Sequence, residues 1–132
     1  MGEAFHVQFL GDAFDDRCSS GWRPATDIYE TAGSVIIKMA ISGLRLPQDA
    51  EIRVIDSEVI IRGRRRDYSA ADKTAYHHME LCYGPFERRF VINVPFDPDH
   101  IEAHYEDGFL FVELPKAATP PRKRVELIVS YE

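Results

Sequence analysis

Apolar and polar residues alternate along most of the middle of this chain, and this period of two restricts the fold more than any other feature. In residues 35–41 one face carries four apolar side chains, Val35, Ile37, Met39 and Ile41. Because successive side chains of a strand point to opposite faces of a sheet, this stretch is predicted to be a strand. A helical period is hard to find anywhere. We therefore predict an all-β domain with strands at residues 28–31, 35–41, 51–55, 59–62, 86–94, 101–106 and 109–114.

A tight hairpin is predicted at Asp107-Gly108. A two-residue hairpin loop of the favoured handedness needs positive φ at both positions, which Asp tolerates and Gly prefers. Residues 101–106 and 109–114 should therefore be antiparallel neighbours. The second segment is apolar on both faces, so it is expected to be central in its sheet or covered by a partner. Turn residues recur between the strands at the spacing of a sandwich of two antiparallel sheets.

The carboxyl-terminal part begins with a short linker and ends with a separate strand pattern. Residues 115–121 read PKAATPP, and beyond them Val125, Leu127 and Val129 alternate with Glu126 and Ile128, which is a strand pattern. A strand delivered on an arm can add to an exposed sheet edge or groove, either its own or a neighbour's. The alternative is a final strand of the same sheet. We divide the chain into an arm (1–21), a domain (22–116) and an extension (117–132).

The amino-terminal arm carries aromatic and apolar residues with acidic residues among them; the apolar ones include Phe5, Phe9, Leu10 and Phe14. No long period is sustained, so the arm is expected to be disordered or a short amphipathic helix. Such side chains are either buried against a partner subunit or offered to other apolar chains. The alternative is that they cover one edge of the domain.

Residues 64–84 form the longest connection. Its first half is polar, and its second half (TAYHHMELCY) could form a strand. A connection this long inside a compact domain is usually functional or binds something.

Candidate catalytic and metal-binding patterns are weak. The phosphate-cradling, nucleophile-elbow and zinc-protease motifs are all missing from the sequence. Cys18 and Cys82 are too few for a disulfide framework, so two reduced thiols are preferred. Zinc ligation by His77, His78 and Cys82, with His100 or His104, is disfavoured because adjacent strand residues point to opposite sides. Cys82 as a nucleophile lacks an orienting third group.

The charge pattern argues against nucleic acid as a partner. The net charge is −6, although arginines cluster at Arg62, Arg64, Arg65 and Arg66, again at Arg88 and Arg89, and near the end of the chain. The sequence has no recognition helix and no aromatic residues spaced to stack on bases. These arginines are therefore interpreted as a solvated strand end or as donors of salt bridges between subunits. No stretch resembles a secretory signal or a membrane span, so a cytoplasmic protein without stable membrane insertion is expected.

Four motifs in order resemble the small heat-shock proteins, whose shared unit is the α-crystallin domain. WRPATDIYET resembles the opening of that domain, and YGPFERRF resembles a later motif in which Arg88 takes the arginine position. The hairpin AHYEDGFLFVELPK resembles the family signature with its closing L-P-K. Val125-Glu126-Leu127 is similar to the tail motif written I-x-I. The resemblance covers residue 22 to about residue 129.

The resemblance implies an immunoglobulin-like β-sandwich with flexible arms and an ATP-independent holdase that binds partly unfolded proteins. It implies no catalysis and no cofactor. Its partners would be itself, as a dimer and a larger dynamic homo-oligomer, and non-native client proteins bound by the amino-terminal arm. The dimer would exchange the strand of residues 76–82, with interface residues Tyr76, His78, Met79, Leu81 and Arg88.

The tail would dock in a groove between residues 51–55 and 101–106, lined by Ile52, Val54, Ala103 and Tyr105. The main alternative function is a co-chaperone or adaptor module of the same architecture that binds one folded partner. An enzyme that uses Cys82 is a third possibility.

Overall fold

The computed structural model describes residue 18 and residues 22–69, 71–118 and 124–131. The arm residues that sequence reasoning assigned to client binding, Phe5, Phe9, Leu10 and Phe14, lie outside the described residues. No helix in these ranges is both long and apolar enough to cross a membrane.

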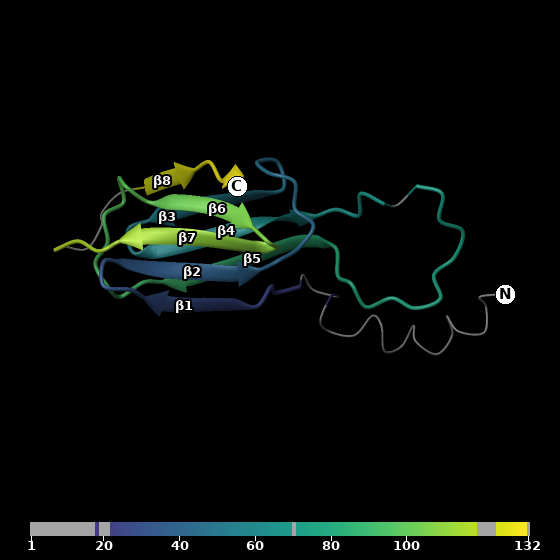
Figure 1. Ribbon diagram of the computed structural model, residues 1–132, viewed down its shortest axis with the longest axis horizontal. Helices are drawn as coiled ribbons and strands as arrows, with labels where there is room; N and C mark the ends of the chain where they lie inside the picture. Colours follow the sequence, from purple (N-terminus) through teal and green to yellow (C-terminus); the bar gives the residue numbers. More distant parts are fainter. Residues whose placement is uncertain (1–17, 19–21, 70, 119–123, 132) are drawn as a thin grey trace.

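Two packed sheets make up the described part of the chain, which confirms the predicted all-β sandwich (Figure 1). One sheet has the strand order β1-β2-β7-β6-β9, and the other has the order β5-β4-β3-β8. All neighbouring strands are antiparallel except β6 and β9, which are parallel. The strands are β1 (Thr26–Glu30), β2 (Ser34–Ala40), β3 (Ala50–Ile55), β4 (Glu58–Arg65), β5 (Gly84–Val91), β6 (Glu102–Glu106), β7 (Phe109–Pro115), β8 (Arg124–Leu127) and β9 (Ser130–Tyr131).

The alternating pattern correctly predicted the faces of β2 and the hairpin between β6 and β7. Val35, Ile37 and Met39 are buried between the sheets. Asp107 and Gly108 both have positive φ, 54° and 81°, and Glu106 pairs with Phe109 across the turn. The hairpin loop therefore has the two residues that its backbone requires.

β7 is central in its sheet, between β2 and β6, as its two apolar faces predicted. Its inner face packs in the core through Leu110, Val112 and Leu114. On the outer face the Lys38 ammonium lies 4.2 Å from the centre of the Phe109 ring. The ring of His104 stacks on that of Phe111 with their centres 4.9 Å apart. Side chains of the same sheet thus cover the outer face of β7 in part.

Two strand ends differ most from the predicted ones: β4 continues through polar residues, and β5 ends before its apolar sequence does. β4 extends to Arg65 because the positions up to Gly63 pair with β3, and those up to Arg65 pair with β5. β5 ends at Val91, short of the predicted residue 94. There the Ile92 N–H donates to the Ser57 carbonyl (2.8 Å) and the Ile92 side chain is buried in the core, so this apolar residue packs without continuing the strand.

Gly63 is required by the close approach of β3 to β4, and alanine at this position should destabilise the fold. A Cβ at Gly63 would lie 2.1 Å from the Asp49 carbonyl oxygen and 2.8 Å from the Ala50 Cα. Backbone must move to relieve this, so we expect Gly63→Ala to lower the free energy of unfolding by about 3 kcal/mol, measured by denaturant titration. The matched control is Gly33→Ala, whose Cβ would meet nothing within 4 Å. Equal midpoints for the two variants would contradict this account.

Candidate functional site

The first candidate surface is the edge of β3, where the tail lies. β8 pairs antiparallel with β3, so that Val125 is opposite Val54 and Leu127 is opposite Ile52. Ile52 and Val54 are fully buried, and both tail side chains pack against the same core. The structure therefore brings the predicted tail motif together with two of the four predicted groove residues, within a single chain.

The end of the tail reaches the other sheet. Ser130 pairs with His104 and Tyr131 with Tyr105, so β9 extends β6 as a parallel strand. Between β8 and β9, Val129 is only 5% exposed and joins the core. The groove residues Ala103 and Tyr105 are buried too, and the Tyr105 hydroxyl donates to the Ile41 carbonyl (2.7 Å). The tail thus runs along the edges of both sheets and closes one side of the sandwich (Figure 1).

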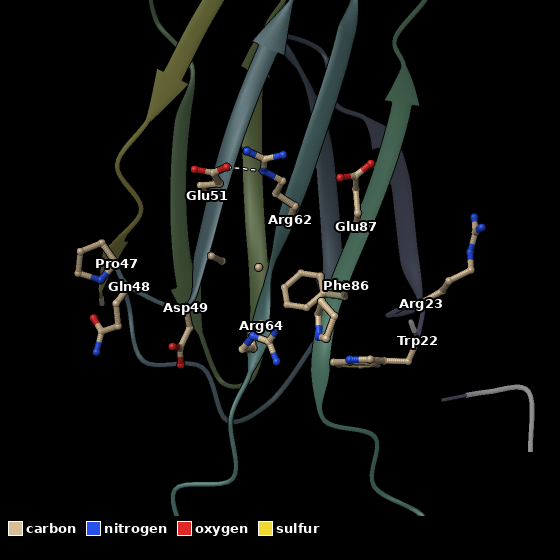
Figure 2. A pocket seen from close by; sticks show the side chains of 13 residues that line it. Trp22, Arg23, Pro47, Gln48, Asp49, Glu51, Arg62, Arg64, Phe86 and Glu87 are labelled. Atoms are coloured by element: carbon tan, nitrogen blue, oxygen red, sulfur yellow. Dashed lines mark hydrogen bonds and ion pairs between the residues drawn. The ribbon is translucent and has the colours of Figure 1, made fainter. Parts of the chain in front are cut away.

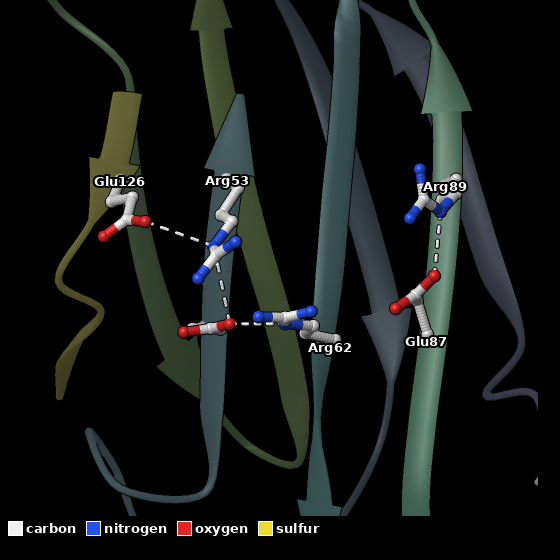
Figure 3. Close-up of polar contacts among 6 residues, drawn as sticks. Arg53, Arg62, Glu87, Arg89 and Glu126 are labelled. Carbon is white, nitrogen blue, oxygen red and sulfur yellow. Dashed lines mark hydrogen bonds and ion pairs between the residues drawn. The ribbon is translucent and has the colours of Figure 1, made fainter. Parts of the chain in front are cut away.

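A row of charged side chains continues from the tail across the outer face of its sheet (Figure 3). Glu126 of β8 lies 3.2 Å from Arg53 of β3, which also lies 3.6 Å from Glu51. Arg62 of β4 donates to Glu51, and this hydrogen bond lowers the pKa of the Glu51 carboxyl. These side chains are 37–65% exposed, so solvent screens each pair and each contributes little to stability. The opposite charges favour the register that places Val125 and Leu127 over the core.

The second candidate surface is the edge of β1. Within the described part of the chain, β1 pairs with β2 alone and leaves its other side open. Its side chains Ile28 and Tyr29 are 42% and 45% exposed. An open edge presents unpaired backbone N–H and C=O groups, which can accept a further strand.

The long connection between β4 and β5, residues 66–83 with residue 70 outside the described part, extends away from the sandwich (Figure 1). We call it the β4–β5 loop. The expected strand at residues 76–82 does not form in this single chain. Tyr76 and Leu81 are exposed, Met79 is half-buried, and the His78 ring contacts the Glu80 carboxylate at 2.6 Å. A strand requires a pairing partner, and no strand in the described ranges pairs with this loop.

One root of the β4–β5 loop is fixed by Asp49, whose side chain is fully buried. The Tyr68 hydroxyl donates to both Asp49 carboxylate oxygens (2.9 and 2.8 Å), and Arg66 Nη1 donates to one of them (2.5 Å). The backbone N–H of Arg45 also donates to this carboxylate (2.8 Å). Sequence reasoning missed Asp49, because no local pattern distinguishes a buried carboxylate from an exposed one in a turn.

The other root is fixed by Arg65, the last residue of β4. Its Nε and Nη2 donate to the Cys82 carbonyl at 3.0 and 2.5 Å. The guanidinium lies 4.2 Å from the centre of the Trp22 ring and 5.3 Å from that of Tyr83. Burial lowers the pKa of Arg65. The loop therefore leaves and rejoins the domain at two fixed points.

The cysteines correct the prediction of two reduced thiols. Cys18 and Cys82 form a disulfide with their Cα atoms 5.5 Å apart, within the usual range for such a bond. They are 64 residues apart in the sequence, and Trp22, four positions after Cys18, forms a bridge with Phe86, four positions after Cys82. This proximity has no local sequence signal.

Arg88 was predicted at the dimer interface and here contacts its own chain. Its Nη1 donates to the Pro24 carbonyl (2.7 Å), and its guanidinium lies 5.0 Å from the centre of the Phe90 ring. Burial, together with the nearby charge of Arg23, lowers its pKa. Arg88 thus holds the segment that leads into β1, next to the open edge.

The ring contact between Trp22 and Phe86 borders a hollow of about 750 Å³ at the end of the β3-β4-β5 surface. Figure 2 shows these rings on one side, Asp49 on the other and the bridged pair of Glu51 and Arg62 above. The lining mixes aromatic groups with charges of both signs, which is not the pattern of a dedicated anion or cation site.

The remaining candidates for chemistry are spread over the fold. Within the described ranges no cluster of three or more His, Cys, Asp or Glu side chains could hold a metal ion. His100 contacts Asp97, and Cys82 is in the disulfide. Of the arginines considered for nucleic acid, Arg62 and Arg66 bind carboxylates of the same chain. These contacts fit the solvated strand end that the sequence suggested.

Comparisons with known proteins agree with this architecture. The Hsp20/alpha crystallin family matches residues 27–129. Small heat shock protein C2 of Rickettsia felis is 27% identical over 93% of this chain and 79% of its own, and small heat shock protein C4 of that species is 28% identical over 79% and 63%.

Solved structures give the same result. A small heat-shock protein from Xylella fastidiosa is 31% identical, with a TM-score of 0.66 over 79% of this chain and 95% of its own. HspA from Xanthomonas axonopodis is 29% identical, with a TM-score of 0.65 over 74% and 96%. The chain therefore belongs to the Hsp20/alpha crystallin family of small heat-shock proteins, which are molecular chaperones.

Proposed function

We propose that this protein is an ATP-independent holdase that binds partly unfolded proteins and prevents their aggregation under heat or other stress. The observation that carries the proposal is the tail, a separate apolar segment that lies along the edges of both sheets. When such a segment leaves, it uncovers apolar side chains and unpaired strand edges, the features that bind non-native chains. The family membership supports the same function.

The tail is suited to exchange between a chain's own groove and a neighbour's. Burying Val125 and Leu127 contributes roughly 1.5 to 3 kcal/mol for each side chain. Ordering the backbone costs roughly 1 to 2 kcal/mol for every residue fixed, so a single docked tail is only marginally stable. Several tails that bind at once gain from high effective concentration. We therefore infer a dynamic homo-oligomer in which Ile52, Val54, Ala103 and Tyr105 receive tails of neighbouring subunits. The Xylella protein is described as having a distinct high order structure.

We propose that the building block of this assembly is a dimer formed by exchange of residues 76–82. The loop that carries them extends from fixed roots, and β1 offers an open edge that can accept a strand. Tyr76, His78, Met79 and Leu81 would then lie against β1 of the partner. Arg88 would lie beside the same edge, since it holds the segment before β1 of its own chain.

The amino-terminal arm, with Phe5, Phe9, Leu10 and Phe14, is proposed to bind clients together with the uncovered edges. The proposal needs no nucleotide, cofactor or nucleic acid. The cytoplasmic location expected from the sequence stays a prediction.

A client-protection assay tests the holdase. At sub-stoichiometric to equimolar levels, the full chain should suppress heat-induced light scattering of an unrelated enzyme to the same extent with and without ATP. The control is an equal mass of an inert globular protein. Scattering that the chain leaves unchanged, across several clients and temperatures, would refute the holdase. A protein that retains one folded partner and protects no client would favour the adaptor alternative.

A further inference from the structure

The disulfide between Cys18 and Cys82 joins the base of the amino-terminal arm to the base of the β4–β5 loop. Cys82 is the residue whose carbonyl Arg65 binds, two positions before β5 begins. Cys18 lies four positions before Trp22, whose ring contacts Phe86. The bond therefore connects two segments that the sandwich already holds close together.

Contacts next to the disulfide hold the two segments together independently of the bond. Trp22 forms a parallel bridge with Phe86, and its indole N–H donates to the Gly84 carbonyl (3.3 Å). Four positions back along each segment from the bridge are Cys18 and Cys82. These contacts do not involve the bond, so they can hold the two segments together at the bridge after reduction.

Both cysteines are only half-buried. An external thiolate can therefore reach the bond, whereas a fully buried disulfide would first require unfolding. The Arg65 guanidinium binds the backbone carbonyl of Cys82, so the position of this residue is fixed by a contact other than the bond.

We propose that Cys18 and Cys82 form a reversible thiol–disulfide switch that fixes or releases the amino-terminal arm. A dithiol reductant attacks the Cys18 sulfur, forms a mixed disulfide and releases the Cys82 thiolate. The second thiol of the reductant then attacks the reductant sulfur of the mixed disulfide and releases the Cys18 thiolate. The reductant leaves with its own two sulfurs joined in a disulfide. Two electrons and two protons pass to the protein, and the S–S bond becomes two S–H groups.

The two states differ in where the arm is anchored. In the oxidised chain the arm is fixed at residue 18, and in the reduced chain the first described anchor is Trp22. Residues 76–81 lie on the loop side of the bond, so both states leave them able to reach a partner. The switch therefore acts on the arm and leaves the proposed dimer intact. Its effect on client binding rests on the proposed function, but its effect on the arm does not.

The test uses limited trypsin digestion of the full chain. Arg17 precedes Cys18 directly, and Arg23 is followed by Pro24, which blocks cleavage there. We expect residues 1–17 to be released about tenfold more slowly from the oxidised protein than from protein reduced with dithiothreitol, because cleavage next to an anchored residue requires local opening. Cys18→Ser should be cleaved at the fast rate under both conditions. Val91→Ser, at an exposed position at the end of β5 away from Cys82, should keep the redox difference.

Thiol labelling and mass measurement complete the test. The oxidised chain should bind no maleimide, bind two after native treatment with dithiothreitol, and bind none again after exposure to oxidised glutathione. Its dimer mass should be equal in both states. Three results would overturn the switch: two free thiols under oxidising conditions, a bond reduced only in denaturant, or a disulfide between two chains. If the labelling and digestion results are as expected but the protein protects no client, the holdase is refuted and the switch is not.

Discussion

Replacing Val125 and Leu127 together by alanine should convert the oligomers largely to dimers. Each side chain loses most of its contact with the core beneath β3, which is worth about 1 to 2 kcal/mol for a half-buried group. Since one docked tail is marginal, a loss of this size is enough to release it, and an assembly held by several tails loses all of them at once. Light scattering or sedimentation velocity measures the change in mass.

The matched control is Ile128→Ala, one position beyond the motif. Ile128 is 85% exposed, so its truncation removes little contact and should leave the oligomer size unchanged. Unfolding measured on the same variants separates the two interpretations of the tail. If β8 is a permanent final strand of its own sheet, the double alanine variant should lose stability and keep its mass. That outcome would contradict tail exchange between subunits.

Deleting residues 70–81 and joining the ends with a short Gly-Ser linker should give a folded monomer. The linker can be short because Arg65 and Gly84 already pair across β4 and β5 at the base of the loop. Both roots survive, since Asp49 with Tyr68 and Arg65 with Cys82 lie outside the deletion. The loss of three apolar side chains from the proposed exchanged strand removes about 5 kcal/mol, more than a thousandfold in Kd.

Lys73→Ala is the control for the deletion. Lys73 binds Asp67 and Tyr76 within the loop, and Asp67 raises its pKa to about 12, but it precedes the segment proposed to exchange. This variant should remain a dimer. Sedimentation equilibrium gives the dissociation constants, and far-ultraviolet circular dichroism checks the sandwich. A deletion variant that stays a tight dimer would place the interface elsewhere.

The sequence alone was sufficient for the fold class and for the local geometry of the strands. Alternation in β2 specified its buried face, and Asp107-Gly108 specified the hairpin, because both depend on residues within a few positions of each other. The motifs were also sufficient for the family, which the comparisons confirm. The tail was recognised from its apolar spacing and from the linker before it.

Contacts between distant segments were decided only by the tertiary structure. The disulfide, the burial of Asp49 and the clamp of Arg65 on Cys82 each join residues that no local pattern relates. The loop at residues 76–82 has an apolar pattern typical of a strand. A strand also needs a second strand to satisfy its backbone, and none of the strands in the described part of the chain pairs with this loop. The sequence thus determined which segments can pair, and the packing of the two sheets determined which of them meet.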